Sequence, residues 1–351
     1  MAQFSIPGLR IAGIAACVPK NVVSNHDYKW VSQKERNLLI KTIGVETKRH
    51  VSKGITTGDM CEKAALRLFD ELKWDKEEVR LLVFVSQTRD YFIPQTSGIL
   101  QHKLGLPNSC ISLDIGLGCS GYVYGLSIMG SLMRQMGINK GLLLVGDIST
   151  LNSAYRDKST YPLFGDAGTA TAIELDSNAD ITHFNLQGDG SGFDAIIIPD
   201  GGMRNILTKK SFDYKKMSPG IHRSKLHVAL NGIEVFNFSL REVVPNIKKH
   251  LEFTGEKLDD FDYIVFHQAN KLINNTLRKM LKLDISKVPL SIGKYGNTSS
   301  ASIPLTIVSE LREEIAQKKV KLMLSAFGIG LSWGTVSLTM DYPIIPEILE
   351  I

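Results

Sequence analysis

The sequence has few cysteines and no long apolar run. Its 351 residues contain four cysteines, Cys17, Cys61, Cys110 and Cys119, and no two of them form a C-x-x-C pair. Cysteines scattered in this way argue against a zinc site or a disulfide framework. The longest apolar runs, such as residues 81–85, fall far short of the roughly 20 residues that a membrane span needs. The N-terminus lacks a basic segment followed by an apolar core, which predicts no signal peptide and a cytoplasmic protein.

The sequence also has little net charge. There are 41 Lys and Arg residues against 36 Asp and Glu residues, a net charge of +5. A slightly basic enzyme explains this balance better than a nucleic-acid-binding protein does. With 43% hydrophobic and 22% charged residues, disorder and collagen-like repeats are excluded. The length predicts about two domain-sized units, and no linker rich in proline or glycine divides them.

Apolar runs alternate with amphipathic stretches from end to end, which predicts an α/β architecture. The expected strands are residues 81–85, 112–115, 142–145, 169–175, 263–266, 321–324 and 335–340, and the repeat pairs residues 288–291 with 112–115. The expected helices are residues 60–72, 95–104, 122–136, 241–253, 272–283 and 300–317. The same order recurs after about 180 residues: strand, glycine-containing turn, helix, strand, Phe-Gly segment, strand. This repeat predicts two duplicated halves, residues 1–176 and 177–351, around a pseudo-twofold axis.

Cys119 lies in a Gly-Cys-Ser-Gly turn between an expected strand and an expected helix. A lone cysteine is more often a small buried hydrophobic residue than a nucleophile. The flanking glycines, however, permit a sharp turn that exposes the side chain. A helix N-terminus favours the thiolate through its dipole and unpaired N–H groups. Cys119 is therefore the candidate nucleophile, and the other three cysteines are interpreted as structural.

His267 and Asn297 are the other candidate catalytic residues. His267 begins the polar segment His-Gln-Ala-Asn directly after an apolar strand, the place where α/β enzymes collect their sites, although a core histidine is the alternative. Asn297 occupies the position in the second half that Cys119 occupies in the first, although it could simply form a turn or cap a helix. A neutral amide suits the stabilisation of an enolate oxygen. The Gly-Asp-Gly-Ser-Gly segment at 188–192 is interpreted as a loop, so no cofactor is predicted.

Four ordered motifs, Gly-Cys-Ser-Gly, His-Gln-Ala-Asn, Gly-Asn-Thr-Ser and Phe-Gly-x-Gly-x-x-Trp-Gly, resemble those of the thiolase superfamily. They are most similar to β-ketoacyl-acyl-carrier-protein synthase III over nearly the whole chain. The resemblance implies a thiolase-like αβαβα five-layered fold from two duplicated halves, a homodimer, and a triad of Cys119, His267 and Asn297. It implies a decarboxylating Claisen condensation in fatty acid or specialised lipid and polyketide synthesis.

The resemblance also implies a role for each residue. Cys119 takes the acyl group, while His267 and Asn297 hold the malonyl thioester. The backbone N–H groups of Cys119 and Gly330 form the oxyanion hole, and Phe92 crosses the dimer interface to line the partner's acyl pocket.

The expected partners are acyl carrier protein, coenzyme A thioesters, or both. Leu38 and Thr42 stand where the family commonly has a Trp and an Arg for coenzyme A, although Trp30, Arg36 and Lys41 lie nearby. This favours a specialised synthase loaded by a carrier protein. An acidic carrier would dock on a basic helix face, although a solvated face explains it equally well. The residues of this face are Lys271, Arg278 and Lys282, and the resemblance adds Lys279, which matches a docking position of the family.

Other functions remain open at this point. An acyltransferase that moves the Cys119 acyl group to an alcohol or amine is the main alternative. A hydroxymethylglutaryl-coenzyme A synthase would need a Glu near residues 86–92, where only Asp90 is present. A degradative thiolase would need a second cysteine after Cys119, and none follows. A papain-like hydrolase or a non-catalytic dimer subunit fits the motif set less well.

Overall fold

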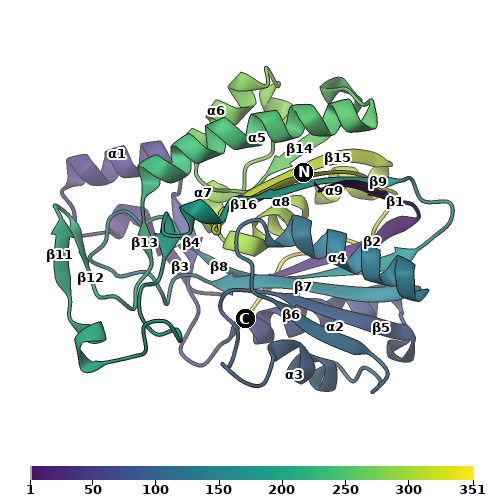
Figure 1. The fold of residues 1–351 in the computed structure, drawn as a ribbon, viewed down its shortest axis with the longest axis horizontal. Coiled ribbons are helices and arrows are strands. Elements are labelled where there is room, and N and C mark those ends of the chain that lie inside the picture. The colour runs from purple at the N-terminus through teal and green to yellow at the C-terminus, as the bar shows by residue number, and fades with distance from the viewer. Residues whose placement is uncertain (1) are drawn as a thin grey trace.

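Two central sheets, separated and flanked by helices, organise the computed structural model, which describes residues 2–351 (Figure 1). The first sheet has the order β17-β2-β8-β7-β5-β6, with β17 (Leu349–Glu350), β2 (Leu9–Val18), β8 (Asp166–Leu175), β7 (Lys140–Ile148), β5 (Val79–Val85) and β6 (Ile111–Ile115). The second has the order β1-β9-β16-β15-β14, with β1 (Ala2–Ile6), β9 (Thr182–Gly188), β16 (Ser332–Met340), β15 (Val320–Gly328) and β14 (Tyr263–Phe266).

Helices form the other three layers. The helices α4 (Gly121–Met136) and α8 (Ser302–Glu310) lie between the two sheets and share one apolar core with both. The outer face of the first sheet is covered by α2 (Thr57–Leu72) and α3 (Thr96–Lys103), and that of the second by α5 (Gly232–Thr254) and α6 (Lys271–Met280). This is the five-layered αβαβα architecture that the sequence predicts.

The helices show why each layer forms. In α2, a capping box between Thr56 and Asp59 starts the helix, and Met60, Ala64 and Leu68 recur on one face that packs against the first sheet. By contrast, α4 is apolar on several sides because it lies between two sheets. Its Gly125 lets β7 approach closely, since a Cβ there would lie 2.9 Å from a methyl carbon of Leu143.

The two sheets share a pairing pattern. In the series β2-β8-β7-β5 and in the series β9-β16-β15-β14, the successive pairs are antiparallel, antiparallel and parallel. This agreement supports the proposal that residues 1–176 and 177–351 are duplicated halves. The terminal strands cross between them, because β1 pairs with β9 and β17 pairs with β2.

Some elements differ from the sequence-based prediction. The segment 288–291, which corresponds to β6 in the repeat, forms no strand; it contains Pro289, which has no N–H to donate to a ladder, and it leads into the short α7 (Ile292–Tyr295). The expected helix 300–317 is divided into a 3-10 turn, α8 and α9 (Arg312–Gln317). The helix α6 ends at Met280, so Lys282 lies in the turn that follows it.

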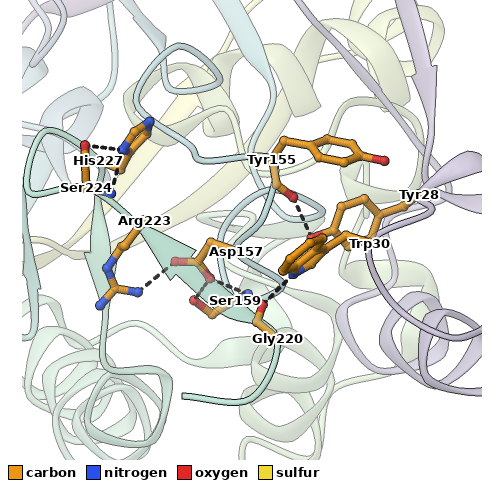
Figure 2. Close-up of polar contacts among 9 residues, drawn as sticks. All are labelled: Tyr28, Trp30, Tyr155, Asp157, Ser159, Gly220, Arg223, Ser224 and His227. Carbon is orange, nitrogen blue, oxygen red and sulfur yellow. Dashed lines mark hydrogen bonds and ion pairs between the residues drawn. The ribbon is translucent and has the colours of Figure 1, made fainter. Parts of the chain in front are cut away.

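A peripheral region surrounds α1 (Gln33–Ile43) at one end of the molecule (Figure 1). Its strands are β3 (Val22–Ser24), β4 (Thr47–Arg49), β10 (Ile196–Ile197), β11 (Lys215–Ser218), β12 (Ile221–Arg223) and β13 (Ala229–Leu230). Figure 2 shows how the β11–β12 hairpin is anchored: Arg223 pairs with the fully buried Asp157 at 2.7 Å, and the Trp30 indole donates to the carbonyl of Gly220. Across residues 2–351, no helix has both the length and the apolar character needed to cross a bilayer.

Candidate active site

Cys119 lies in the turn between β6 and α4 and is 5% exposed. The end of β15 approaches it so closely that a Cβ on Gly328 would lie only 2.4 Å from the Cβ of Cys119. The thiol Sγ lies 4.0 Å from the hydroxyl oxygen of Ser299, which belongs to the other half of the chain. The nucleophile predicted from the sequence is therefore located where the connections of the two sheets meet.

His267 directly follows β14 and is 1% exposed. Its backbone N–H donates to the carbonyl of Ser325, which continues the parallel pairing of β14 with β15. Its ring nitrogen Nδ1 lies 2.7 Å from the hydroxyl oxygen of Ser302, and its ring packs edge-on against Phe327. These contacts fix the ring orientation.

Asn297 follows α7, and its position is held by the other half of the chain. Its backbone N–H donates to the carbonyl of Leu163 at 2.9 Å, and its carbonyl accepts from the N–H of Gly165 at 3.1 Å. Its side-chain oxygen accepts from the N–H of Ser299 at 2.8 Å, while its amide nitrogen donates to the carbonyl of Ala269 at 3.3 Å. These bonds define which end of the amide carries its donors.

Ser299 connects the three predicted catalytic residues. Its hydroxyl lies beside the Cys119 thiol, its N–H bonds the Asn297 side chain, and its backbone hydrogen-bonds the His267 ring. Its φ of 52° is a left-handed conformation that non-glycine residues seldom adopt. The sequence analysis did not identify Ser299; the signal available was the Ser-Ser-Ala-Ser run that follows Asn297.

Asp147 is a second residue that the sequence analysis missed. It lies near the end of β7, is 1% exposed, and accepts hydrogen bonds from the Ser86 hydroxyl and the Gln87 N–H. Its other oxygen accepts from the Ser300 hydroxyl at 2.7 Å. Burial raises the pKa of this carboxyl group. Through these hydrogen bonds, Asp147 at the end of β7 links the segment that follows β5 to the turn that contains Ser299 and Ser300.

Burial determines the protonation of the site. It raises the pKa of Cys119 to about 11, and the charge of Asp147 acts in the same direction. It lowers the pKa of His267 to about 3, against a hydrogen bond with the Ser299 backbone. Both groups are therefore neutral near pH 7. Desolvation thus opposes the thiolate that the sequence analysis expects at the start of α4.

The sequence analysis expected the backbone N–H groups of Cys119 and Gly330 at the reacting sulfur, but the structure has those of Cys119 and Ile329 there. Hydrogen bonds from the backbone of Ile329 and of Cys119 itself reach the Cys119 sulfur and oppose the rise of its pKa. The sequence analysis instead selected Gly330, which has a φ of 132° and precedes Leu331. The correction follows from register: Gly328, at the end of β15, contacts Cys119, and this brings the N–H of Ile329 to the sulfur.

The close approach of Gly328 to Cys119 gives a prediction. Gly328→Ala should place a methyl group against the Cβ of Cys119, displace the nucleophile and lower its acylation rate at least tenfold. Intact-protein mass spectrometry of the acylated enzyme over time would measure this rate. Gly190→Ala is the matched control, because a Cβ at Gly190 meets nothing within 4 Å. An unchanged acylation rate in Gly328→Ala would contradict the assigned packing.

A cavity of about 240 Å³ begins beside Ser299 and Ile329. A second cavity of about 830 Å³ shares part of its lining with the first, including Gln87 and Asn152, and extends to Tyr91 and Phe92. The two cavities are therefore neighbours, and the first reaches Ser299 and Ile329, which lie at the Cys119 thiol. In residues 2–351, no cluster of three or more His, Cys, Asp or Glu side chains could hold a metal ion.

The remaining predicted site residues lie at the surface. Phe92 is 65% exposed, in an apolar segment with Tyr91 and Ile93. Lys271 and Lys279 are exposed on α6, whereas Arg278 turns back to donate to the carbonyl of Leu283. Of the residues expected near a coenzyme A site, Leu38 is 63% exposed on α1, and Trp30 is held by Gly220 (Figure 2).

Comparisons with known proteins agree with this geometry. A family model described as 3-oxoacyl-[acyl-carrier-protein] synthase III matches residues 113–190, and the model of its C-terminal part matches residues 251–340. The β-ketoacyl-[acyl-carrier-protein] synthase III of Clostridioides difficile strain 630 is 30% identical over 326 residues, which cover 92% of this chain and 96% of that protein. The synthase of the same name from Clostridium tetani is 30% identical over 334 residues, covering 93% and 96%.

A solved structure is similar over the whole chain. It is a 3-oxoacyl-(acyl-carrier-protein) synthase from Burkholderia xenovorans LB400, with a TM-score of 0.94 and 36% sequence identity. The match covers 100% of this chain and 99% of the other.

Proposed function

The chain belongs to the 3-oxoacyl-[acyl-carrier-protein] synthase III family, and from this premise we propose that it catalyses the decarboxylating condensation of an acyl thioester with malonyl-acyl carrier protein. The product is a 3-oxoacyl thioester for fatty acid or specialised lipid synthesis. The observation that carries the proposal is that Cys119, Asn297 and His267, which come from separate turns, converge on Ser299. Its hydroxyl lies 4.0 Å from the Cys119 sulfur, its N–H donates to the Asn297 side chain, and its backbone acts on the pKa of His267.

In the first half-reaction, the sulfur of Cys119 attacks the carbonyl carbon of the acyl thioester. The bond from that carbon to the donor sulfur breaks, the donor leaves as a thiol, and the proton of Cys119 passes to it. The N–H groups of Ile329 and Cys119 face the sulfur, so they are placed to stabilise the oxyanion of the tetrahedral intermediate. Enclosure of the site excludes water that would hydrolyse the acyl-enzyme.

In the second half-reaction, His267 and Asn297 bind the thioester carbonyl of the malonyl group. The bond between the α-carbon and the carboxylate breaks, carbon dioxide leaves, and the electron pair forms an enolate. A neutral imidazole and the second N–H of the Asn297 amide donate to the enolate oxygen without adding positive charge. The α-carbon then attacks the acyl-Cys119 carbonyl, the Cys119 sulfur leaves as a thiolate, and this thiolate takes up one proton from the solvent. The loss of carbon dioxide drives the carbon–carbon bond formation.

Two measurements test this proposal. Incubation with an acyl thioester should add the mass of the acyl group to the intact protein, and peptide mapping should place it on Cys119. Subsequent addition of malonyl-acyl carrier protein should remove that mass and release one carbon dioxide per 3-oxoacyl product. Release of free acid without carbon dioxide would indicate a hydrolase, and transfer of the acyl group to an alcohol or amine would indicate an acyltransferase.

The carrier protein is proposed to dock on the exposed basic face of α6. Because Lys271 and Lys279 are exposed and α6 begins four residues after His267, Lys271→Glu and Lys279→Glu should each raise KM for malonyl-acyl carrier protein several-fold at low salt, with little effect on kcat. The carrier concentration dependence of condensation measures this. Lys318→Glu, on an exposed lysine after α9, is the control. Equal KM values in all variants would remove α6 from the docking surface.

A homodimer is also part of the proposal. The segment 91–93 exposes three large apolar side chains, with Phe92 65% and Ile93 86% exposed. The strand β6 lies at the edge of the first sheet and has one unpaired side. An exposed apolar segment next to a free strand edge is typical of a surface that a second copy covers. Phe92 borders the second cavity, so a partner at this surface would close it.

A further inference from the structure

We propose that the acyl group accepted by Cys119 is of medium size and carries a hydrogen-bonding substituent, such as a hydroxyl, oxo or amino group. This inference rests on the proposed function, since it names the acyl donor of the same site. It is drawn from the size of the cavity that reaches Ser299 and Ile329 and from the mixture of apolar and polar side chains that line it.

The cavity is too large for an acetyl group alone. Its volume is about 240 Å³, and Ser299 and Ile329 of its wall also contact Cys119. At about 30 Å³ per non-hydrogen atom, the volume that a water molecule takes in the liquid, it holds about eight such atoms. An acetyl group has three. An acyl group of six to eight atoms fills this cavity.

Part of the cavity lining is apolar and is held in place by the fold. It consists of Phe164, Ile196, Ile197, Ile198, Val228 and Ile329. The pairing of β10 with β13 fixes Ile196, and the N–H of Val228 donates to the carbonyl of the neighbouring Asn152 at 2.8 Å. The β11–β12 hairpin, which lies in the connection from β10 to β13, is itself anchored through Arg223 and Asp157 (Figure 2). This apolar lining is preformed and suits the carbon skeleton of an acyl group.

The same cavity lining carries polar side chains that have no partner in the protein. Among residues 2–351, the side chains of Gln87, Ser149 and Asn152 have no hydrogen-bond partner within the protein. By contrast, the Asp147 carboxylate and the Thr88 hydroxyl of the same lining are bonded to neighbours. Gln87 is exposed and the other two side chains are only partly buried, so their donors and acceptors are accessible to an acyl group.

Gln87 is the polar side chain of the lining that lies next to the residue before Cys119. Its amide oxygen lies only 2.3 Å from the place where a Cβ on Gly118 would be, so the amide covers the residue that precedes Cys119. A polar substituent on the acyl chain would meet this amide, or Asn152 further along. A plain alkyl chain would leave these groups facing methylene carbons and cost their hydrogen bonds with water. The geometry therefore favours a substituted acyl group over an alkyl group of equal length.

The test is a competition on the unmodified enzyme. Acetyl, hexanoyl, 3-hydroxyhexanoyl and 5-hydroxyhexanoyl thioesters are mixed at equal concentrations, once on coenzyme A and once on acyl carrier protein, and the acyl-Cys119 species are measured by intact mass at early times. We expect at least one hydroxyhexanoyl form to exceed hexanoyl about tenfold, and hexanoyl to exceed acetyl. Preferential loading of acetyl, or of hexanoyl over both hydroxy acids, would overturn the inference.

Variants of the polar lining residues test whether those side chains cause the preference for a hydroxylated acyl group. Gln87→Leu and Asn152→Leu should reduce the ratio of hydroxyhexanoyl to hexanoyl loading toward one, while Asn178→Leu, on an exposed turn, should leave it unchanged. Each ratio is measured within one variant, so differences in folded fraction cancel. Acylation of Cys119 by every thioester, but with acetyl or hexanoyl favoured, would overturn only this inference. If no thioester acylated Cys119, the proposed function would fail with it.

Discussion

Replacement of His267 by alanine should lower the rate of malonyl-acyl carrier protein decarboxylation by about 10²- to 10⁴-fold. His267 is buried, its ring is held by Ser302 and packed against Phe327, and its low pKa keeps it neutral. Removing it deletes one of two donors to the enolate oxygen in an enclosed site, where such bonds are strong. The acylation of Cys119 should persist, because that step uses the N–H groups of Ile329 and Cys119. Release of labelled carbon dioxide and intact mass measure the two steps separately.

The matched control is His250→Ala. His250 is also fully buried and bonded to a serine hydroxyl, that of Ser337, but it lies on α5 on the outer side of the second sheet. It should cost stability without changing decarboxylation per folded molecule. Undiminished decarboxylation in His267→Ala would rule out the role assigned to this histidine. Equal loss in both variants would mean that general destabilisation explains the effect.

Replacement of Cys119 by alanine should remove the acyl-enzyme and lower condensation at least about 10³-fold. Decarboxylation of malonyl-acyl carrier protein should continue in this variant, because His267 and Asn297 and their contacts with the Ser299 backbone remain. The two variants therefore divide the reaction: one keeps acylation and the other keeps decarboxylation. Mass spectrometry after incubation with an acyl thioester, together with carbon dioxide release, measures both.

Cys110→Ala is the control for the nucleophile. Cys110 is buried like Cys119, and its pKa is also raised to about 11 by burial, but it precedes β6 at the other end of that strand. Acylation and condensation should be unchanged in this variant. An acyl adduct that persists in Cys119→Ala and disappears in Cys110→Ala would transfer the nucleophile role to Cys110.

The fold could be predicted to a large extent because its signals are local. The strand Tyr263–Phe266 was expected at these bounds, and α4 and α2 extend the expected helices by only a few residues. Apolar runs and helical periodicity record which faces are buried, and both sheets bury their strands deeply. The prediction was wrong where one residue changed a local preference, as Pro289 did in the segment that corresponds to β6.

The site could be predicted only in part. The chemical types of Cys119, His267 and Asn297, and their places after strands and in glycine-containing turns, follow from sequence motifs. Ser299, Asp147 and Ile329 were missed because their contacts with those residues are long-range. Ser299 follows Cys119 by 180 residues, and Asp147 meets Ser300 across 153 residues. The pattern of apolar and polar residues within one half of the chain does not predict which backbone group of the other half will approach the Cys119 thiol.

The sequence by itself determined the α/β class, the internal repeat and the candidate chemistry, because burial periodicity and the order of side-chain types are properties of the linear chain. Only the tertiary structure decided the protonation of the site and the shape of the acyl cavity. A helix N-terminus next to Cys119 predicts a thiolate, but the pKa of the thiol depends on the water excluded by all surrounding elements, and here exclusion raises it to about 11. Likewise, the sequence does not show that Gln87 and Asn152 line the same cavity as a set of apolar side chains; only the tertiary structure places them there.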